Sequence, residues 1–230
     1  MKITKAFVKK LLPIIDAGLC IGLGQPKPGE MCVEAAVCYA KGVEHGDNPA
    51  CVSPVVRRLV LILNDANWSS DMARAKGMRR LAIAQLGTTG QINKNIFAEM
   101  VAEISIKKTV PRALRCVAKI YPDKVHQEAL EEAAVDCETK GTAHAARAAA
   151  NAAYAADHAA YAAHAADHAA YAADHAAHAA AHAARAADHA AANAAYAADI
   201  ELGLFAEDVV QLLIQLKAPG ADWLSLTEAA

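Results

Sequence analysis

The chain has 230 residues, enough for one large domain or two small ones with a real hydrophobic core. Its 23 Lys and Arg residues nearly balance its 25 Asp and Glu residues, so no general positive field attracts nucleic acid or an anionic membrane. We therefore expect neither nucleic acid nor a membrane as a partner.

The amino-terminal residues begin like a signal peptide but do not continue like one. Pro13 and Asp16 interrupt the apolar run, and Lys9 and Lys10 lie inside it, so an ordinary helix is predicted. The chain also lacks a long, uncharged, strongly apolar stretch of the kind that spans a bilayer. We expect a cytoplasmic protein whose six cysteines are reduced thiols.

The first predicted helices are short and separated by loops. Apolar spacing from Phe7 to Ile15 predicts a helix that Gly18 ends. The Gly- and Pro-rich stretch GLGQPKPGE predicts a loop, and the spacing of small and apolar residues from Glu30 to about Lys41 predicts a second helix.

A helix start follows at Ser53, with serine as N-cap and Pro54 at the first helical position. The next residues, VVRRLVLILND, could form a buried strand or a helix, and the start signal favours a helix. Another helix is expected to begin at 67–70 and to end at 87–90.

Further helices are predicted near 93–108, 111–119 and 123–139. No segment shows convincing period-two alternation bounded by turns, so no sheet is needed. We predict an all-α protein with two parts: a helical domain over 1–140, and residues 141–230 with an alanine-rich long helix and a C-terminal helix.

Residues 143–199 follow a strict seven-residue pattern. The heptad positions of Ala148, Ala149 and Ala152 are alanine in every repeat, and these positions adjoin one another on a helix. A smooth alanine face allows another helix to approach closely, and a seven-residue period favours a left-handed supercoil. Because neither Gly nor Pro lies between Thr142 and Gly203 to make a hairpin turn, we expect pairing with a second copy in a bundle or coiled coil, hence a homo-oligomer.

The opposite face of this helix carries tyrosine, histidine and arginine side chains. One interpretation is that the rings fill the wider side of a helical bundle. Another is metal binding, because neutral imidazoles spaced three or four residues apart share one helix face and can ligate zinc, nickel or copper. The candidate ligands are His164, His168, His175, His178 and His182. Tyr161 and Tyr171 are candidate ligand-binding residues on the same face.

Cys32 stands near the start of the second predicted helix. The field of the helix N-terminus is expected to lower the pKa of this thiol, and a cysteine hydrolase could then use His45 or His126 as its base. The alternative is a small buried residue. Cys32, Cys38, His45 and Cys51 could also hold zinc, although their spacing lacks a tight Cys-Cys knuckle; buried thiols remain the simpler interpretation.

Two arginine pairs, Arg57-Arg58 and Arg79-Arg80, could form a pocket with Arg74 and Lys76 for phosphate or another anion, or for a nucleotide. Paired arginines on helices are also commonly solvated or bound to surface carboxylates. The sequence has no P-loop, dinucleotide fingerprint, zinc-protease motif or nucleophile elbow, and we expect no cofactor.

The runs MCVEAAVCYAKGVEHGDNPACV and LNDANWSSDMARAKGMRRLAIAQLG resemble uncharacterised bacterial and phage-associated proteins that end in Ala-Tyr-Ala-Ala repeats. The run ALRCVAKIYPDKVHQEALEEA with the alanine tract is similar to helical proteins described as immunity proteins of bacterial toxin systems. These resemblances imply a role in bacterial or phage conflict and assign no catalytic residue.

Together these patterns predict a non-enzymatic, self-associating helical binding protein, with an inhibitor or immunity-type role implied by the resemblance. Its partner would be another protein or a small anionic ligand. Two alternatives stay open: a protein that sequesters a small molecule, nucleotide or metal, and a hydrolase that uses Cys32.

Overall fold

The computed structural model describes residues 2–121, 123–142, 145, 148, 149, 151, 152 and 198–228. Within these residues the chain is all-α, as predicted, and an isolated bridge between Gly24 and Met31 is the only β-structure. No helix in this described part is both long and apolar enough to cross a bilayer.

The contacts divide the chain into two compact units. Unit 1 comprises Met1–Val101 and Ala195–Ala230, and unit 2 comprises Ala102–Ala194. The predicted division after residue 140 stays a prediction.

Unit 1 is built from short helices whose ends carry local signals. The helices are α1 (Lys5–Asp16), α2 (Val33–Lys41), α3 (Pro54–Asn64), α4 (Asp71–Ala84), the start of α5 (Lys94–Ile104), a helix over 198–215 and the 3-10 helix η2 (Pro219–Thr227). Ser70 caps α4 through its hydroxyl, which accepts a hydrogen bond from the Ala73 backbone N–H at 3.1 Å. Pro54 occupies the first turn of α3, so the predicted start and the helical interpretation of this run are both confirmed.

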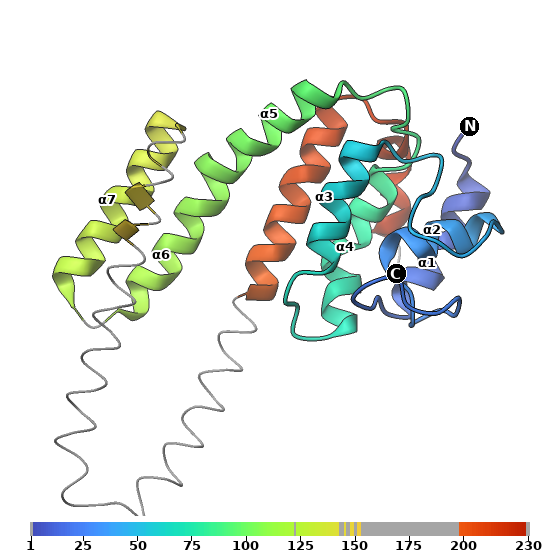
Figure 1. The fold of residues 1–230 in the computed structure, drawn as a ribbon, viewed down its shortest axis with the longest axis horizontal. Coiled ribbons are helices and arrows are strands. Elements are labelled where there is room, and N and C mark those ends of the chain that lie inside the picture. Colours follow the sequence, from blue (N-terminus) through green and yellow to red (C-terminus); the bar gives the residue numbers. More distant parts are fainter. Residues whose placement is uncertain are drawn as a thin grey trace, which may run out of the picture. The chain divides into compact units, whose positions relative to one another are not determined.

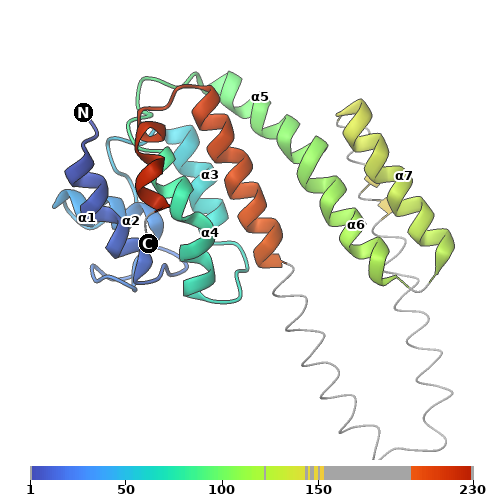
Figure 2. The same ribbon diagram turned by 180° about the vertical axis from the view of Figure 1, so that it is seen from behind.

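The core of unit 1 holds large aliphatic side chains. Leu11 and Ile15 on α1 and Leu81 on α4 are fully buried, as is Leu213 on the helix 198–215. Figures 1 and 2 show that helix, in orange, running beside α3 and α4. The C-terminal segment therefore completes a core begun by the first residues of the chain.

A buried arginine fixes the loops of unit 1. Arg74 is 2% exposed, and its guanidinium donates to the carbonyl oxygens of Asn64 and Leu19, at 2.7 Å each, and to Asp71 at 2.6 Å. These partners compensate the cost of burying the charge. Arg74 thus ties the end of α3 and the loop after α1 to α4.

Unit 2 contains the rest of α5, the π-helix η1 (Ser105–Thr109), α6 (Val110–Ile120) and α7 (Lys124–Lys140). In Figures 1 and 2, α6 and α7 lie side by side. Their buried residues form a small core with the first described alanines of the tract: Leu114, Tyr121, Leu130, Ala134, Cys137, Ala145 and Ala149.

The described start of the alanine tract packs by its alanine face. Ala149 is buried and Ala152 is partly buried against this core, whereas Ala148 is exposed. Two of the three all-alanine heptad positions therefore contact α6 and α7 over these turns, as a smooth face permits. The single long helix, its supercoil and its self-pairing concern residues outside the described part and stay predictions.

Candidate functional site

A wide groove in unit 1 lies between α3 and the start of α5. Its cavity volume is about 1260 Å³. Its basic lining residues are Arg57, Arg58 and Lys94, and its larger apolar lining residues include Leu61, Ile62 and Ile92. The structure thus places one of the two predicted arginine pairs at the edge of a concave surface.

The helical periodicity of α3 explains why these residues face the groove. Val56, Val60 and Leu63 are buried in the core of unit 1, so the residues between them turn outward. Ile62 is 62% exposed and lines the groove together with Leu61 and Ile92. The groove therefore combines an apolar wall with the basic residues of α3.

Lys94 adds a positive charge from the opposite side of the groove. Asn93 caps α5, its side-chain oxygen accepting from the backbone N–H groups of Asn95 at 2.9 Å and Ile96 at 3.2 Å. This cap places Lys94 in the first turn of α5. The sequence interpretation did not include Lys94, because only the fold brings it opposite the α3 arginines.

The charges of the groove do not cancel. Arg57 pairs with Asp47 at 3.4 Å, while Arg58 and Lys94 form no ion pair with any residue that the structure describes. Asp65 also lines the groove, but its Oδ1 already accepts hydrogen bonds from the Gly22 backbone N–H and the Asn64 amide, both at 2.9 Å. The groove consequently has a net positive charge beside an apolar wall.

The second predicted arginine pair lies elsewhere, on α4. Arg79 donates to both carboxylate oxygens of Asp16, at 2.6 and 3.0 Å. Arg80 binds Glu207 in the same two-point manner, at 2.9 and 3.5 Å, and contacts Glu228. Neither residue lines the α3–α5 groove, so the structure does not bring the four arginines into one pocket.

Cys32 is at the N-cap of α2, as its predicted position near a helix start implies, and its sulfur accepts from the Ala35 backbone N–H at 3.4 Å. Burial nevertheless raises the pKa of its thiol to about 11, because removal from water disfavours the thiolate more than the helix start favours it. The expected lowering of this pKa is therefore wrong. His45, one suggested base, places its Nε2 3.1 Å from the carbonyl oxygen of Gly24.

None of the six cysteines, all of which lie in the described part of the chain, forms a disulfide bond. Within the described residues, no group of three or more His, Cys, Asp or Glu side chains is arranged to hold a metal ion, and this covers Cys32, Cys38, His45 and Cys51. The candidate residues of the alanine tract lie outside the described residues, and their roles stay predictions: Tyr161, Tyr171, His164, His168, His175, His178 and His182.

A buried carboxyl group, Glu34 on α2, is a feature that the sequence interpretation missed. It is fully buried, and burial raises its pKa to about 8 although the nearby Arg57 cation acts in the opposite direction. Its two oxygens and the amide of the equally buried Gln85 form no hydrogen bond of standard geometry with a described residue, although the nearby Gln85 amide, like Arg57, acts to lower the pKa. Burial therefore favours the protonated form of Glu34 near neutral pH, and Glu34 is not among the residues that line the groove.

Comparison with known proteins adds no relative to this description. No protein-family model, curated protein or solved structure matches the chain.

Proposed function

We propose that the protein is a non-enzymatic helical binding protein, and that the α3–α5 groove holds an acidic amphipathic helix of a protein partner. The observation that carries the proposal is the pair Arg58 and Lys94, both exposed and without an ion pair among the described residues, on opposite sides of a groove with an exposed Ile62.

The size of the groove favours a peptide segment over a small molecule. Small-molecule sites usually have volumes of about 300–1000 Å³, and this groove is larger and open along α3. The 11 residues of α3 span roughly 16 Å at about 1.5 Å per residue, the length of about three helical turns. An apolar stripe on the partner helix would contact Leu61, Ile62 and Ile92, as in other helix-in-groove complexes.

The basic residues of the groove favour negative charge on the flanks of that partner helix. Carboxylates on either side of its apolar stripe would meet Arg58 and Lys94, whereas lysines there would be repelled. An inhibitor or immunity-type role in bacterial or phage conflict is compatible with such a groove, which would cover a segment of another protein. That role rests on the resemblance alone, and self-association through the alanine tract remains a separate proposal.

The test uses a fluorescein-labelled three-turn peptide with leucines at helical spacing and glutamates on both flanks, and a second peptide with lysines instead. Fluorescence anisotropy should show binding of the glutamate peptide and not of the lysine peptide. The double variant Arg58→Glu/Lys94→Glu should weaken binding of the glutamate peptide by about tenfold or more, equivalent to about 1.4 kcal/mol.

The matched control is Lys9→Glu/Lys10→Glu, which makes the same change in net charge at two exposed residues of α1 away from the groove. This control should bind the glutamate peptide as the unaltered protein does. Equal losses in the two double variants, or equal binding of both peptides, would show that the groove does not select an acidic helix.

A further inference from the structure

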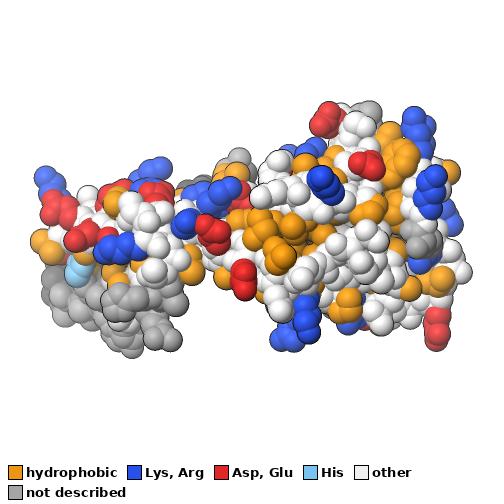
Figure 3. Space-filling view, turned by 90° about the horizontal axis from the view of Figure 1, so that it is seen from above, with side chains coloured by type: hydrophobic (Ala, Val, Ile, Leu, Met, Phe, Trp, Pro, Cys, Tyr) orange, Lys and Arg blue, Asp and Glu red, His pale blue; other side chains and the backbone are white. Residues whose placement is uncertain are grey.

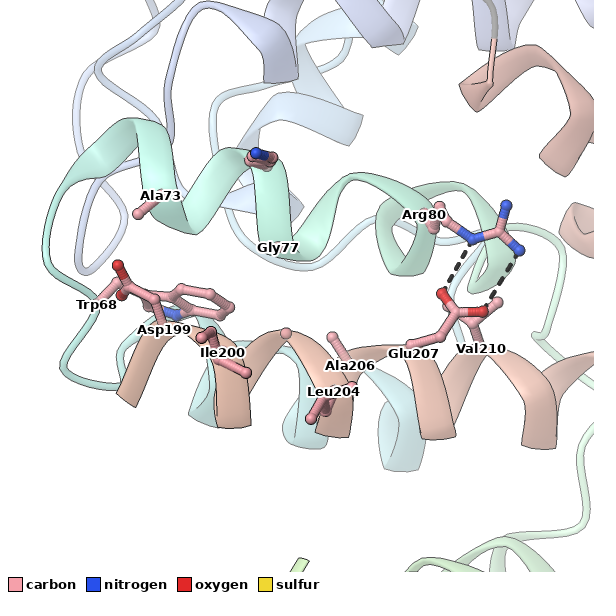
Figure 4. Close-up of a pocket in the computed structure, with 12 residues that line it drawn as sticks. Trp68, Ala73, Gly77, Arg80, Asp199, Ile200, Leu204, Ala206, Glu207 and Val210 are labelled. Carbon is pink, nitrogen blue, oxygen red and sulfur yellow. Dashed lines mark hydrogen bonds and ion pairs between the residues drawn. The ribbon is translucent and has the colours of Figure 1, made fainter. Parts of the chain in front are cut away.

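A second concave surface of unit 1, distinct from the α3–α5 groove, lies between α4 and the helix 198–215. Figure 4 shows the two helices side by side, with Trp68 and Asp199 at one end and the Arg80–Glu207 pair at the other. The cavity between them has a volume of about 510 Å³. This volume is within the range of small-molecule sites.

Polar contacts link the two sides of this cleft at both of its ends. At one end the Ser69 backbone N–H donates to Asp199 at 2.8 Å, and the Ser69 hydroxyl donates to the same carboxylate. At the other end Arg80 binds Glu207 through two nitrogens. Between these links the helices present small residues to each other, so the side chains present cannot fill the space.

One of the two glycines in the cleft has no structural explanation. A Cβ on Gly77 would lie 2.3 Å from the Trp68 ring, so packing requires glycine there. A Cβ on Gly203 would meet no atom of the described residues within 4 Å, and its φ is not positive. Glycine is among the least favourable residues inside a helix. Gly203 therefore leaves one position of the cleft wall without a side chain, and no contact with a described residue requires glycine there.

The chemistry of the walls indicates the kind of ligand. Ile200 and Leu204 line the cleft and remain 45% and 42% exposed, so an apolar ligand could bury part of their surface. Arg80, Asp199 and Glu207 are committed to one another or to Ser69. Lys76, the remaining charged residue of the lining, forms no ion pair with a residue in the described ranges.

We propose that the cleft between α4 and the helix 198–215 binds a small amphipathic anion, with a ring or alkyl body against Trp68, Ile200 and Leu204 and one carboxylate or sulfonate at Lys76. Gly203 keeps the space for the body of the ligand. This site is independent of the groove that would hold a partner helix.

The probe is 1-anilinonaphthalene-8-sulfonate, which has an aromatic body and one negative charge. In a Trp223→Phe background Trp68 is the only tryptophan, so energy transfer from Trp68 reports a probe bound to unit 1, and the cleft variant then assigns the site. Titration should show one saturable site. The variant Gly203→Met places a flexible side chain in the cleft and should weaken binding at least tenfold, while circular dichroism shows an intact fold.

The matched control is Gly46→Met. A Cβ at Gly46 would also meet open space, and the φ of this residue is not positive, but Gly46 lies in a loop outside the cleft. The control should bind the probe normally, as should Arg58→Glu/Lys94→Glu. Normal binding by Gly203→Met, or the absence of a saturable site in the unaltered protein, would overturn the proposal.

The variant Lys76→Met tests the contribution of the Lys76 charge to binding separately from that of the cavity. This variant should bind the sulfonate several-fold more weakly but should retain N-phenyl-1-naphthylamine, which has the same rings and no charge. Gly203→Met should lose both compounds. If Lys76→Met bound the sulfonate as tightly as the unaltered protein, the anionic part of the proposal would be wrong.

Discussion

The two units of this protein achieve compactness by different means. Unit 1 packs large aliphatic side chains from α1, α4 and the helix 198–215 around a core, and the buried Arg74 bonds its loops. Unit 2 packs a few large residues of α6 and α7 against alanines, two of which, Ala145 and Ala149, begin the tract. The stability of unit 1 depends on large side chains that fill its core. The stability of unit 2 depends on small side chains that allow its helices to approach closely.

The two units also differ in the side chains that they expose. Figure 3 shows Lys and Arg side chains next to Asp and Glu side chains over the viewed face of unit 2, while hydrophobic side chains gather in patches on unit 1. In unit 2, Arg115 binds Glu131 at 2.8 Å and Glu138 at 2.5 and 2.8 Å. Both concave surfaces proposed as binding sites belong to unit 1. The unit with the larger aliphatic core thus also carries the exposed apolar residues of both proposed binding sites.

The largest effect is expected from a large-to-small substitution in the core of unit 1. Leu81→Ala should lower the free energy of unfolding of unit 1 by about 3 kcal/mol, because it removes a fully buried side chain and leaves a cavity. Hydrogen exchange of the α4 amides measures this value. Val43→Ala, at a residue that is 51% exposed, should change it by less than about 0.5 kcal/mol; equal effects would contradict a core that depends on filled volume.

A pH-dependent effect should follow from Glu34. Its pKa is raised to about 8 in the folded protein, from an ordinary value of 4.5, so the folded state binds more protons between these values. Stability from this group is fully present below about pH 4.5 and is lost as pH rises through 8, by up to about 1.4 kcal/mol per pH unit. The facing charges are Arg57, which opposes the shift, and Asp47, which adds to it.

Glu34→Gln should therefore reduce this pH dependence and should make unit 1 more stable than in the unaltered protein at pH 8.5. Urea unfolding between pH 5 and 8.5 measures both changes. Parallel stability curves for the variant and the unaltered protein would mean that Glu34 is not a buried neutral acid.

In unit 2 the opposite kind of substitution should be costly. Ala149→Leu should destabilise unit 2 by about 2 kcal/mol, because a larger side chain does not fit where the tract meets α6 and α7. Ala148→Leu, at the adjacent exposed position, should be nearly neutral. Hydrogen exchange of the α7 amides compares the two, and an equal tolerance at both positions would show that close alanine packing is not required.

The smallest effect is expected at the surface of unit 2. Arg115→Ala should cost less than about 1 kcal/mol despite its two carboxylate partners, because Glu131 and Glu138 are substantially exposed and water screens the attraction. The difference between this variant and the unaltered protein should shrink further at high salt. A loss comparable with that of Leu81→Ala would mean that unit 2 depends on its ion pairs.

Local signals made much of the fold predictable. Ser53 stands at the N-cap position of α3 without a side-chain capping bond, Pro54 begins that helix, and Ser70 caps α4 through its hydroxyl. These signals lie next to the helices that they begin, so the sequence alone predicts both starts. The association of the C-terminal segment with α4 depends on contacts such as Arg80 with Glu207, which are distant in sequence and carry no local signal.

The candidate site was predictable only in part. Arg57 and Arg58 were recognisable as an adjacent pair of cations, but Lys94 joins them only because the chain folds back to α5. The expectation for Cys32 failed because its surroundings, rather than its position on the helix, decide its pKa. Glu34 had only a weak signal in the sequence, its position inside the largely apolar run VEAAVC. In the structure α2 is buried on nearly every side, and the carboxyl group is buried with it.

The proposed function can be tested most directly by locating the bound acidic peptide. Hydrogen exchange followed by mass spectrometry, with and without the glutamate-flanked peptide, reports which segments of the intact protein become protected. We expect protection of 53–65 and 90–98, with little change in 71–84 or 124–140, and loss of that protection in Arg58→Glu/Lys94→Glu. Protection confined to other segments, or unchanged in the double variant, would contradict the proposed role of the groove.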